Sequence, residues 1–122
     1  HNINMDMVGR WDILHEKKRD FVYLLTTGKN NQVNFNIGKN DLVLPERFEV
    51  SNKPGSHEKE VFRYGSDHYS FFKRDIPVSV FFTGLHEDYH TPRDTPDKIN
   101  YKNLTNITSV VYQYIYKLTE IE

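Results

Sequence analysis

The side chains best suited to chemistry gather in the segment GLHEDYHTPRDTPD, which begins at Gly84. Within it, His86, Glu87 and His90 form the pattern H-E-x-x-H. That pattern binds one zinc ion when a helix places both imidazoles on one face, with the glutamate beside them as general base. Gly84 precedes the pattern and Pro92 follows it closely, which leaves no room for a stable helix of two turns. A single-zinc site at these positions is therefore kept only as an alternative hypothesis.

A second candidate lies near the start of the chain, where Asp6 stands between two methionines in the sequence NMDM. Taken alone, a carboxylate on a strand is usually a solvated position, and a lone loop histidine such as His90 is usually exposed. Both side chains carry donors that zinc accepts, carboxylate oxygen and imidazole nitrogen. Residue type by itself leaves a surface role and a metal-binding role open for both.

The strands that must position these side chains follow from the hydrophobic pattern. Residues 2–9 alternate apolar and polar side chains and predict a strand that contains Asp6. Residues 20–27 are β-branched and aromatic and predict a second strand. If these two strands pair across a hairpin-like connection, the pairing is antiparallel. The nearly continuous apolar run 76–82 predicts a strand buried on both faces.

Two helices are expected. Residues 66–74 predict a short helix that is capped by Ser66 or Asp67, with its aromatic side chains covering one side. Residues 101–118 carry apolar side chains three or four positions apart, which predicts a long amphipathic helix. That helix also contains two formal glycosylation sequons, beginning at Asn103 and Asn106. In a chain so rich in asparagine we interpret the sequons as chance matches.

Residues 28–60 are rich in asparagine and predict a loop-rich excursion with one short strand near Asp41–Leu44. The order of all elements is strand, strand, loop, helix, buried strand, polar loop and long helix. This order predicts an α/β fold with a mixed β-sheet flanked by helices. Sites in such sheets lie at the carboxyl ends of strands, which is where the polar segment beginning at Gly84 starts.

Composition excludes several classes of function. The 122 residues correspond to one small domain or to part of a larger one. With 16 basic and 17 acidic residues, the net charge of −1 argues against a general nucleic-acid or membrane-surface binder. The absence of cysteine excludes disulfides, thiolate catalysis and cysteine zinc sites. No apolar run approaches the roughly 20 residues that a membrane span needs.

Two motifs occur in a recognisable order. Residues 4–9 have the pattern N-M-D-M-x-G, and residues 66–100 combine S-D-H, an aromatic, a buried strand and Y-H-T-P-x-D-T. Together they resemble the co-catalytic di-zinc aminopeptidases, a family that includes secreted bacterial aminopeptidases and is related to glutamate carboxypeptidase and glutaminyl cyclase. The resemblance covers both ends of the chain well and residues 28–60 poorly. It implies the carboxyl-terminal portion of a zinc-aminopeptidase (phosphorylase/hydrolase-like) fold.

The resemblance also implies roles for single residues. Asp6 would be the carboxylate ligand of one zinc ion and His90 the imidazole ligand of the other. Tyr89 would have a catalytic role, donating a hydrogen bond to the developing oxyanion. The implied structural residues around the site are Asp67, His68 and Asp94. A pair of metal ions activates the attacking water and stabilises the charge on the carbonyl oxygen in such sites.

The rest of the family's site is missing from this sequence. The family uses five protein ligands and takes its general base from a Glu-Glu pair, and the chain contains no such pair. We therefore expect residues 1–122 to be a single carboxyl-terminal portion of a peptidase domain. The intact parent would hold two zinc ions and hydrolyse N-terminal residues from peptides, whereas the isolated chain would be inactive and bind zinc weakly or not at all.

The expected partners follow from the same interpretation. They are a peptide substrate, the missing amino-terminal half of the domain and, through an exposed sheet edge, a second copy of the chain. Nucleic acid and a membrane span are not expected, and relatives suggest a location outside the cytoplasm. A catalytically dead, peptidase-like binding module is the alternative. The presence of Asp6, Tyr89 and His90 argues against it, because a dead scaffold has no need of metal ligands.

Overall fold

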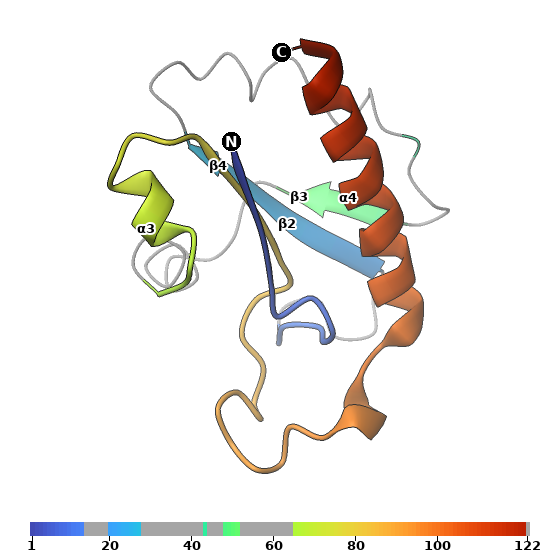
Figure 1. Cartoon of the computed structure of the whole chain (residues 1–122). Coiled ribbons are helices and arrows are strands. Elements are labelled where there is room, and N and C mark those ends of the chain that lie inside the picture. Colours follow the sequence, from blue (N-terminus) through green and yellow to red (C-terminus); the bar gives the residue numbers. More distant parts are fainter. Residues whose placement is uncertain (14–19, 28–42, 44–47, 52–64, 122) are drawn as a thin grey trace.

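The computed structural model describes residues 1–13, 20–27, 43, 48–51 and 65–121. It is a mixed α/β structure in which two helices accompany one four-stranded sheet, as the element order predicts (Figure 1). The strands are β1 (Asn2–Asp6), β2 (Asp20–Thr27), β3 (Phe48–Ser51) and β4 (Val78–Phe82). The helices are α3 (Tyr69–Phe72) and α4 (Tyr101–Ile121), preceded by a 3₁₀ turn at Pro96–Lys98.

The strand order is β1-β4-β2-β3, so β4, the most apolar strand, is an inner strand between β1 and β2. β4 is parallel to β1 and antiparallel to β2, and β2 is parallel to β3. An antiparallel arrangement of residues 2–9 and 20–27 was predicted only on the condition that the two strands pair, and that condition is not met, because β4 lies between them. All five residues of β4 are buried, as predicted for residues 76–82, and a strand buried on both faces takes an inner place in a sheet.

β1 and β4 end together because they are parallel. The last residue of β1, Asp6, is paired with the last residue of β4, Phe82. The chain leaves both strands at the same end of the molecule, at the bottom of Figure 1. We call residues 7–13 and 83–95 the carboxyl-end loops. Their common origin is what brings the two ends of the sequence together.

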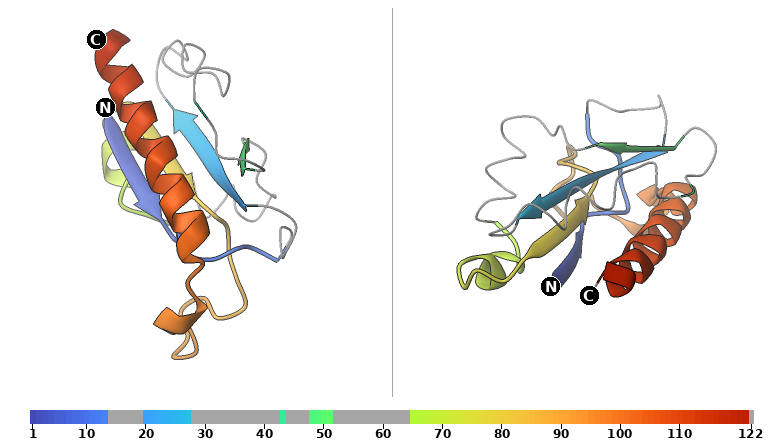
Figure 2. Two further views of the ribbon diagram at one scale, coloured as in Figure 1. Left: turned by 90° about the vertical axis from the view of Figure 1, so that its right-hand side faces the viewer. Right: turned by 90° about the horizontal axis from the view of Figure 1, so that it is seen from above.

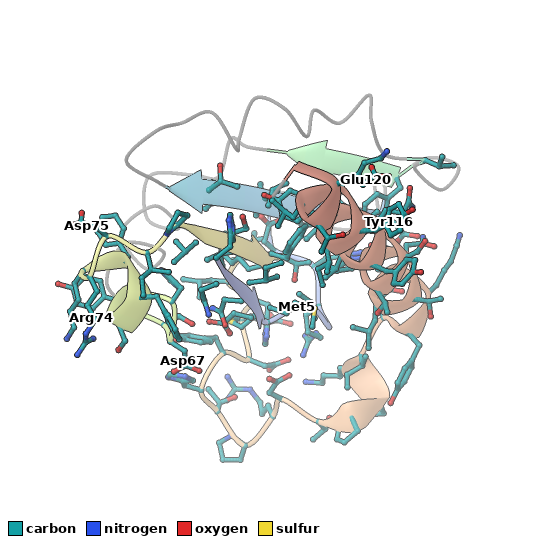
Figure 3. The ribbon with its side chains drawn as sticks, turned by 45° about the horizontal axis from the view of Figure 1, so that its top comes forward. Met5, Asp67, Arg74, Asp75, Tyr116 and Glu120 are labelled. Carbon is teal, nitrogen blue, oxygen red and sulfur yellow. The ribbon has the colours of Figure 1, made fainter. Side chains whose placement is uncertain are left out.

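The main hydrophobic core lies between the sheet and α4, which runs along one face of it (Figure 2). The predicted helix over residues 101–118 is confirmed and continues to Ile121. Its apolar stripe packs on the sheet through Ile107, Val110, Val111, Tyr114 and Leu118. Ile115 has the three-or-four-residue spacing of the apolar side chains in residues 101–118, but it is 43% exposed. Figure 3 shows Tyr116 and Glu120 projecting from the outer side of α4.

Asparagine side chains fix the start of α4. Asn100 is the residue before the first turn, and its Oδ1 accepts a hydrogen bond from the backbone N–H of Asn103 at 3.1 Å, an N-terminal cap. Asn103 is fully buried and pairs with the backbone of Phe21 in β2. Its Oδ1 accepts from the N–H of Phe21 at 3.1 Å and its Nδ2 donates to the carbonyl of Phe21 at 3.1 Å. The first sequon therefore begins at a side chain that joins α4 to the sheet.

The predicted helix over residues 66–74 is only partly right. α3 has four residues, and no side-chain hydrogen bond caps it, so neither Ser66 nor Asp67 is its cap. Phe71 and Phe72 are 40% and 38% exposed, and none of the helix is buried. Aromatic side chains indicated a helix here, but without a core to pack against the helix does not extend beyond Phe72.

The prediction for residues 28–60 is tested only in part. Residues 28–42, 44–47 and 52–60 lie outside the described residues, and so does all but Val43 of the strand predicted at Asp41–Leu44. Val43 itself is not in a strand, whereas β3 forms at Phe48–Ser51 inside the stretch predicted as loops. Among the helices of the described residues, none has the length and apolar character that crossing a membrane would require.

Candidate metal-binding site

Asp6 occupies the last position of β1, whereas the sequence pattern predicted a strand running on to residue 9. The strand stops because Met7 has a φ of 52°, in the left-handed region that a residue with a Cβ rarely adopts. The carbonyl of Met7 accepts a hydrogen bond from Oγ1 of Thr83, the first residue after β4. Asp6 thus stands at the carboxyl end of its strand, beside the start of the second carboxyl-end loop.

His90 lies on a tight turn of that second loop. The carbonyl of Asp88 accepts hydrogen bonds from the backbone N–H of Thr91 at 3.0 Å and from Oγ1 of Thr91 at 2.8 Å. His90 has a φ of 55°, and its ring stacks on Tyr89 with 3.8 Å between centroids. Left-handed residues other than glycine are strained and cluster at functional sites. Of the three such residues in the described part of the chain, Met7 directly follows Asp6 and another is His90, whereas Asp75 lies outside the loops after β1 and β4.

Asp6 and His90 line one cavity of about 450 Å³ at this end of the molecule. Four further side chains singled out from the sequence line the same cavity: His68, His86, Tyr89 and Asp94. Val80, Phe82 and Ile99 supply part of its apolar wall. The structure therefore brings together residues that are more than 80 positions apart in the sequence.

Asp67 and His68, which the resemblance implied as structural residues, lie in different environments. His68 is buried, and its Nδ1 lies 3.4 Å from Nδ2 of Asn4, which also donates to Oγ of Ser66 at 3.0 Å. These contacts join the segment before α3 to β1 two residues before Asp6. Asp67, in contrast, is exposed and does not line the cavity.

A buried carboxylate organises the second carboxyl-end loop. The side chain of Asp88 is 4% exposed and accepts hydrogen bonds from three cations. Nζ of Lys98 lies 2.7 Å away, Nη2 of Arg10 3.1 Å away and Nε of Arg93 3.2 Å away. The bond from Lys98 is the largest cause, and with Arg10 and Arg93 it lowers the pKa of Asp88 to about 2. Asp88 is therefore ionised at all ordinary pH values.

Arg10, which belongs to the first carboxyl-end loop, makes a second ion pair with the second loop. Its Nη1 donates to Oδ1 of Asp94 at 2.9 Å, while its Nη2 donates to Asp88. Sequence analysis missed Arg10 and Asp88. Both are charged residues in polar segments, and a single sequence does not distinguish a buried ion pair from two solvated charges. Their proximity to the two motifs was the available signal.

His86 is a buried imidazole in the same cavity wall. Its Nε2 lies 3.8 Å from Oδ2 of Asp94, and its Nδ1 is buried with no hydrogen-bond partner among the described residues. Burial and the charge of Arg10 lower the pKa of His86 below its usual 6.5, although Asp94 and Asp88 oppose the shift. His86 is therefore neutral at pH 7 in the folded chain.

The single-zinc hypothesis requires His86 and His90 on one face of a helix, and that helix is absent here. Residues 87–90 form a turn, and no residue between Gly84 and Thr95 is helical. Glu87, the general base of that hypothesis, is exposed and does not line the cavity. The flanking Gly84 and Pro92 give the physical reason, as the sequence indicated.

The donor types in the cavity fit zinc, but their number does not complete a site. Asp6 offers carboxylate oxygens and His90 offers ring nitrogens, both common zinc ligands. Within residues 1–13, 20–27, 43, 48–51 and 65–121, no group of three or more His, Asp or Glu side chains is arranged to hold a metal ion. These residues therefore suit part of a coordination shell.

The sequence model of peptidase family M28 matches residues 1–115. The chain belongs to peptidase family M28. Among curated proteins and solved structures, none matches it significantly. M28 peptidases are typically zinc-dependent, so the chain is a zinc-dependent metallopeptidase domain, in the hydrolase class. The family match also includes residues 28–60, where the motif resemblance was weak.

Proposed function

We propose that this M28 chain contributes to a co-catalytic aminopeptidase, in which Asp6 is a ligand of one zinc ion and His90 a ligand of a second. The observation that carries the proposal is that both side chains line one cavity, although they are 84 positions apart in the sequence. Such a pair of ions polarises a peptide carbonyl and lowers the pKa of a water molecule. The remaining ligands and the general base would come from polypeptide outside these 122 residues.

The chain's own residues would orient the substrate. Tyr89 lines the cavity next to His90 and presents a phenol that can donate to the oxygen of the scissile carbonyl as negative charge develops there. The stack of the Tyr89 ring on the His90 ring restricts both side chains. Val80, Phe82 and Ile99 give the cavity an apolar wall, which excludes water from part of the substrate.

The same proposal accounts for the other expected partners. β1 is an edge strand of the described sheet, and Met5 on it is 55% exposed. An uncovered edge strand can pair with another strand. The amino-terminal half of the domain would cover this edge in the parent, and a second copy of the chain would cover it in isolation. A location outside the cytoplasm stays a prediction that rests on the resemblance alone.

The first test joins residues 1–122 to the amino-terminal part of the same polypeptide and measures hydrolysis of an aminoacyl anilide. Asp6→Ala and His90→Ala are expected to abolish hydrolysis. Glu120→Ala, a change of an exposed carboxylate on α4 outside the cavity, is expected to leave it unchanged. Hydrolysis that survives Asp6→Ala and His90→Ala would remove the assignment. Peptide binding without any hydrolysis would favour the binding module instead.

The second test uses the 122-residue chain alone. After dialysis against zinc, metal analysis is expected to find less than one tightly bound zinc ion per chain, because a zinc ion usually needs three or four protein ligands. The single-zinc hypothesis predicts one zinc ion per chain and its loss in the His86→Ala variant. That pair of results would replace the two-metal proposal.

A further inference from the structure

One guanidinium joins the two carboxyl-end loops. Arg10 belongs to the loop after β1, four residues beyond Asp6, and both of its ion-pair partners belong to the loop after β4. Its Nη2 binds Asp88 at 3.1 Å and its Nη1 binds Asp94 at 2.9 Å. Only 17% of the Arg10 side chain is exposed, so its fork is largely withdrawn from water.

The two carboxylates lie on either side of His90 in the sequence. Asp88 comes two residues before it and Asp94 four residues after it. The turn between them places His90 in a left-handed conformation, which the surrounding contacts must maintain. A single side chain from the β1 loop thus holds the turn at both of its ends.

We propose that Arg10 is a positioning residue that fixes the turn carrying His90 relative to the end of β1, which carries Asp6. The inference rests on the proposed function, since it explains how one metal ligand is set against the other. Residues that orient ligands without binding the metal have large effects, and their loss typically weakens metal binding about 10- to 100-fold.

Charge alone does not explain the arrangement. Asp88 also binds Lys98 and Arg93, but these two cations follow Asp88 within ten residues of the same segment. Their ion pairs with Asp88 therefore do not join it to the loop after β1. They neutralise the carboxylate without connecting it to β1. The planar fork of arginine can bind two carboxylates at once, which the single ammonium of a lysine does with much poorer geometry.

Removal of Arg10 would leave neither Asp88 nor Asp94 as an uncompensated buried charge. Asp88 would keep hydrogen bonds from Lys98 and Arg93, at 2.7 and 3.2 Å. The side chain of Asp94 is 43% exposed, so water can solvate it. The main loss is therefore the connection between the β1 loop and the turn that carries His90. The hydrogen bond from Thr83 to Met7 at the start of the two loops remains, and the core between the sheet and α4 is untouched.

The experiment compares the 122-residue chain with its Arg10→Gln, Arg10→Lys and Arg93→Gln variants by amide hydrogen exchange. In the loop, the amides of Thr91 and Asp94 report on the turn, since they bond the carbonyls of Asp88 and Thr91 at 3.0 and 3.1 Å. Both Arg10 variants are expected to speed their exchange about 10-fold, with amides of α4 unchanged. Arg93→Gln, which removes a cation from the same carboxylate, is expected to leave all of them unchanged.

A zinc titration followed by the ring resonances of His90 gives a second readout. Both Arg10 variants are expected to need about 10-fold more zinc for the same shift, and Arg93→Gln is expected to behave like the unmodified chain. If Arg10→Lys matches the unmodified chain, or Arg93→Gln matches Arg10→Gln, charge is sufficient and the proposal is overturned.

Two controls keep the result decisive. If exchange in Arg10→Gln also rises throughout α4, the Asp94→Ala variant is used, because it removes only the more exposed arm of the bridge. Unchanged loop exchange in Asp94→Ala would then overturn the proposal. If zinc causes no shift of the His90 ring resonances in the unmodified chain, the proposed function fails, and the exchange pattern still decides whether Arg10 positions the turn.

Discussion

The contact between α4 and the sheet and the carboxyl-end loops are stabilised in different ways. The first is apolar: Phe81 and Tyr114 are both almost fully buried, with their rings edge to face at 5.2 Å. The second depends on ions, since the buried Asp88 is held by three cations. The core depends mainly on side-chain volumes, with the amide of Asn103 as a polar contact at its edge, whereas the loops depend on the exact positions of charged atoms. A binding site requires atoms fixed in place as they are in these loops.

The largest expected effect tests the apolar side of this comparison. Phe81→Ala removes a fully buried ring between the sheet and α4 and should lower the free energy of unfolding by about 3–5 kcal/mol. Tyr112→Ala on the outer side of α4, where Tyr112 is 72% exposed, should change it by no more than about 0.5 kcal/mol. Chemical denaturation measures both. A loss near 1 kcal/mol for Phe81→Ala would show that this core is loosely packed.

The next effect tests the backbone of the loops. Gly84 has a φ of 88°, and a Cβ built on it would lie 2.6 Å from Cβ of the buried Asp12. Gly84→Ala should therefore cost about 2–4 kcal/mol, from left-handed strain and overpacking. Gly9→Ala is the matched control, since its Cβ would meet only Ile99 at 3.6 Å. Equal stability of both variants would contradict the close approach of residues 12 and 84.

The pH dependence of stability separates the two regions further. The pKa of Asp88 is lowered from 3.8 to about 2 in the folded chain, so the ionised carboxylate stabilises the fold above pH 3.8. That contribution is lost as the pH falls from 3.8 to about 2. The destabilisation caused by Asp88→Asn should therefore shrink over this range, whereas that of Phe81→Ala should stay constant. A pH-independent Asp88→Asn effect would contradict the ion cluster.

His86 should act in a different pH window. Its folded-state pKa is lowered below 6.5, so the unfolded chain takes up a proton first as the pH falls. Stability should be complete above pH 6.5 and decline below it, and His86→Gln should remove that part of the decline. Unfolding free energies measured between pH 7.5 and 5 for both chains, an interval chosen to span the usual pKa, provide the check. An unchanged slope in the variant would show that His86 is not the group responsible.

The smallest effect concerns the start of α4. Asn100→Ala removes the side chain that caps the helix and should cost about 1 kcal/mol. Asn100→Ser keeps a capping oxygen and should lose much less. Thermal unfolding of the two variants gives the comparison. Equal losses would mean that the contact from Nδ2 of Asn100 to Oδ1 of Asp20, at 3.5 Å, which both variants lack, matters more than the cap.

The sequence predicted most of what depends on burial. The apolar run of β4 and the spacing in α4 are direct consequences of packing against a core, and both elements formed where expected. Strand order was not predicted, since nothing local in residues 2–9 or 20–27 shows that β4 will lie between them. The helix over residues 66–74 was overpredicted, because Phe71 and Phe72 favour burial, yet 40% and 38% of their surfaces stay exposed.

Only those residues of the site that belong to the two sequence motifs could be predicted. Asp6, Tyr89 and His90 were chosen from motif letters, and the fold places all three around one cavity. Their role as ligands and oxyanion donor stays a prediction. Arg10 was not found, because the partner of a charged side chain depends on the tertiary fold and leaves no periodic trace in the sequence.

The buried amide that joins α4 to β2 has a practical consequence for expressing this protein. Asn103 begins an N-x-T sequon, yet in the folded chain its side chain is enclosed and occupied by the backbone of Phe21. A eukaryotic host that attached a sugar there during synthesis would prevent the helix from docking. Thr105→Ala would abolish that acceptor signal while leaving Asn103 intact, since Thr105 is exposed and bonds only within its own helix. Recovery of folded material from yeast should therefore improve with this one exchange.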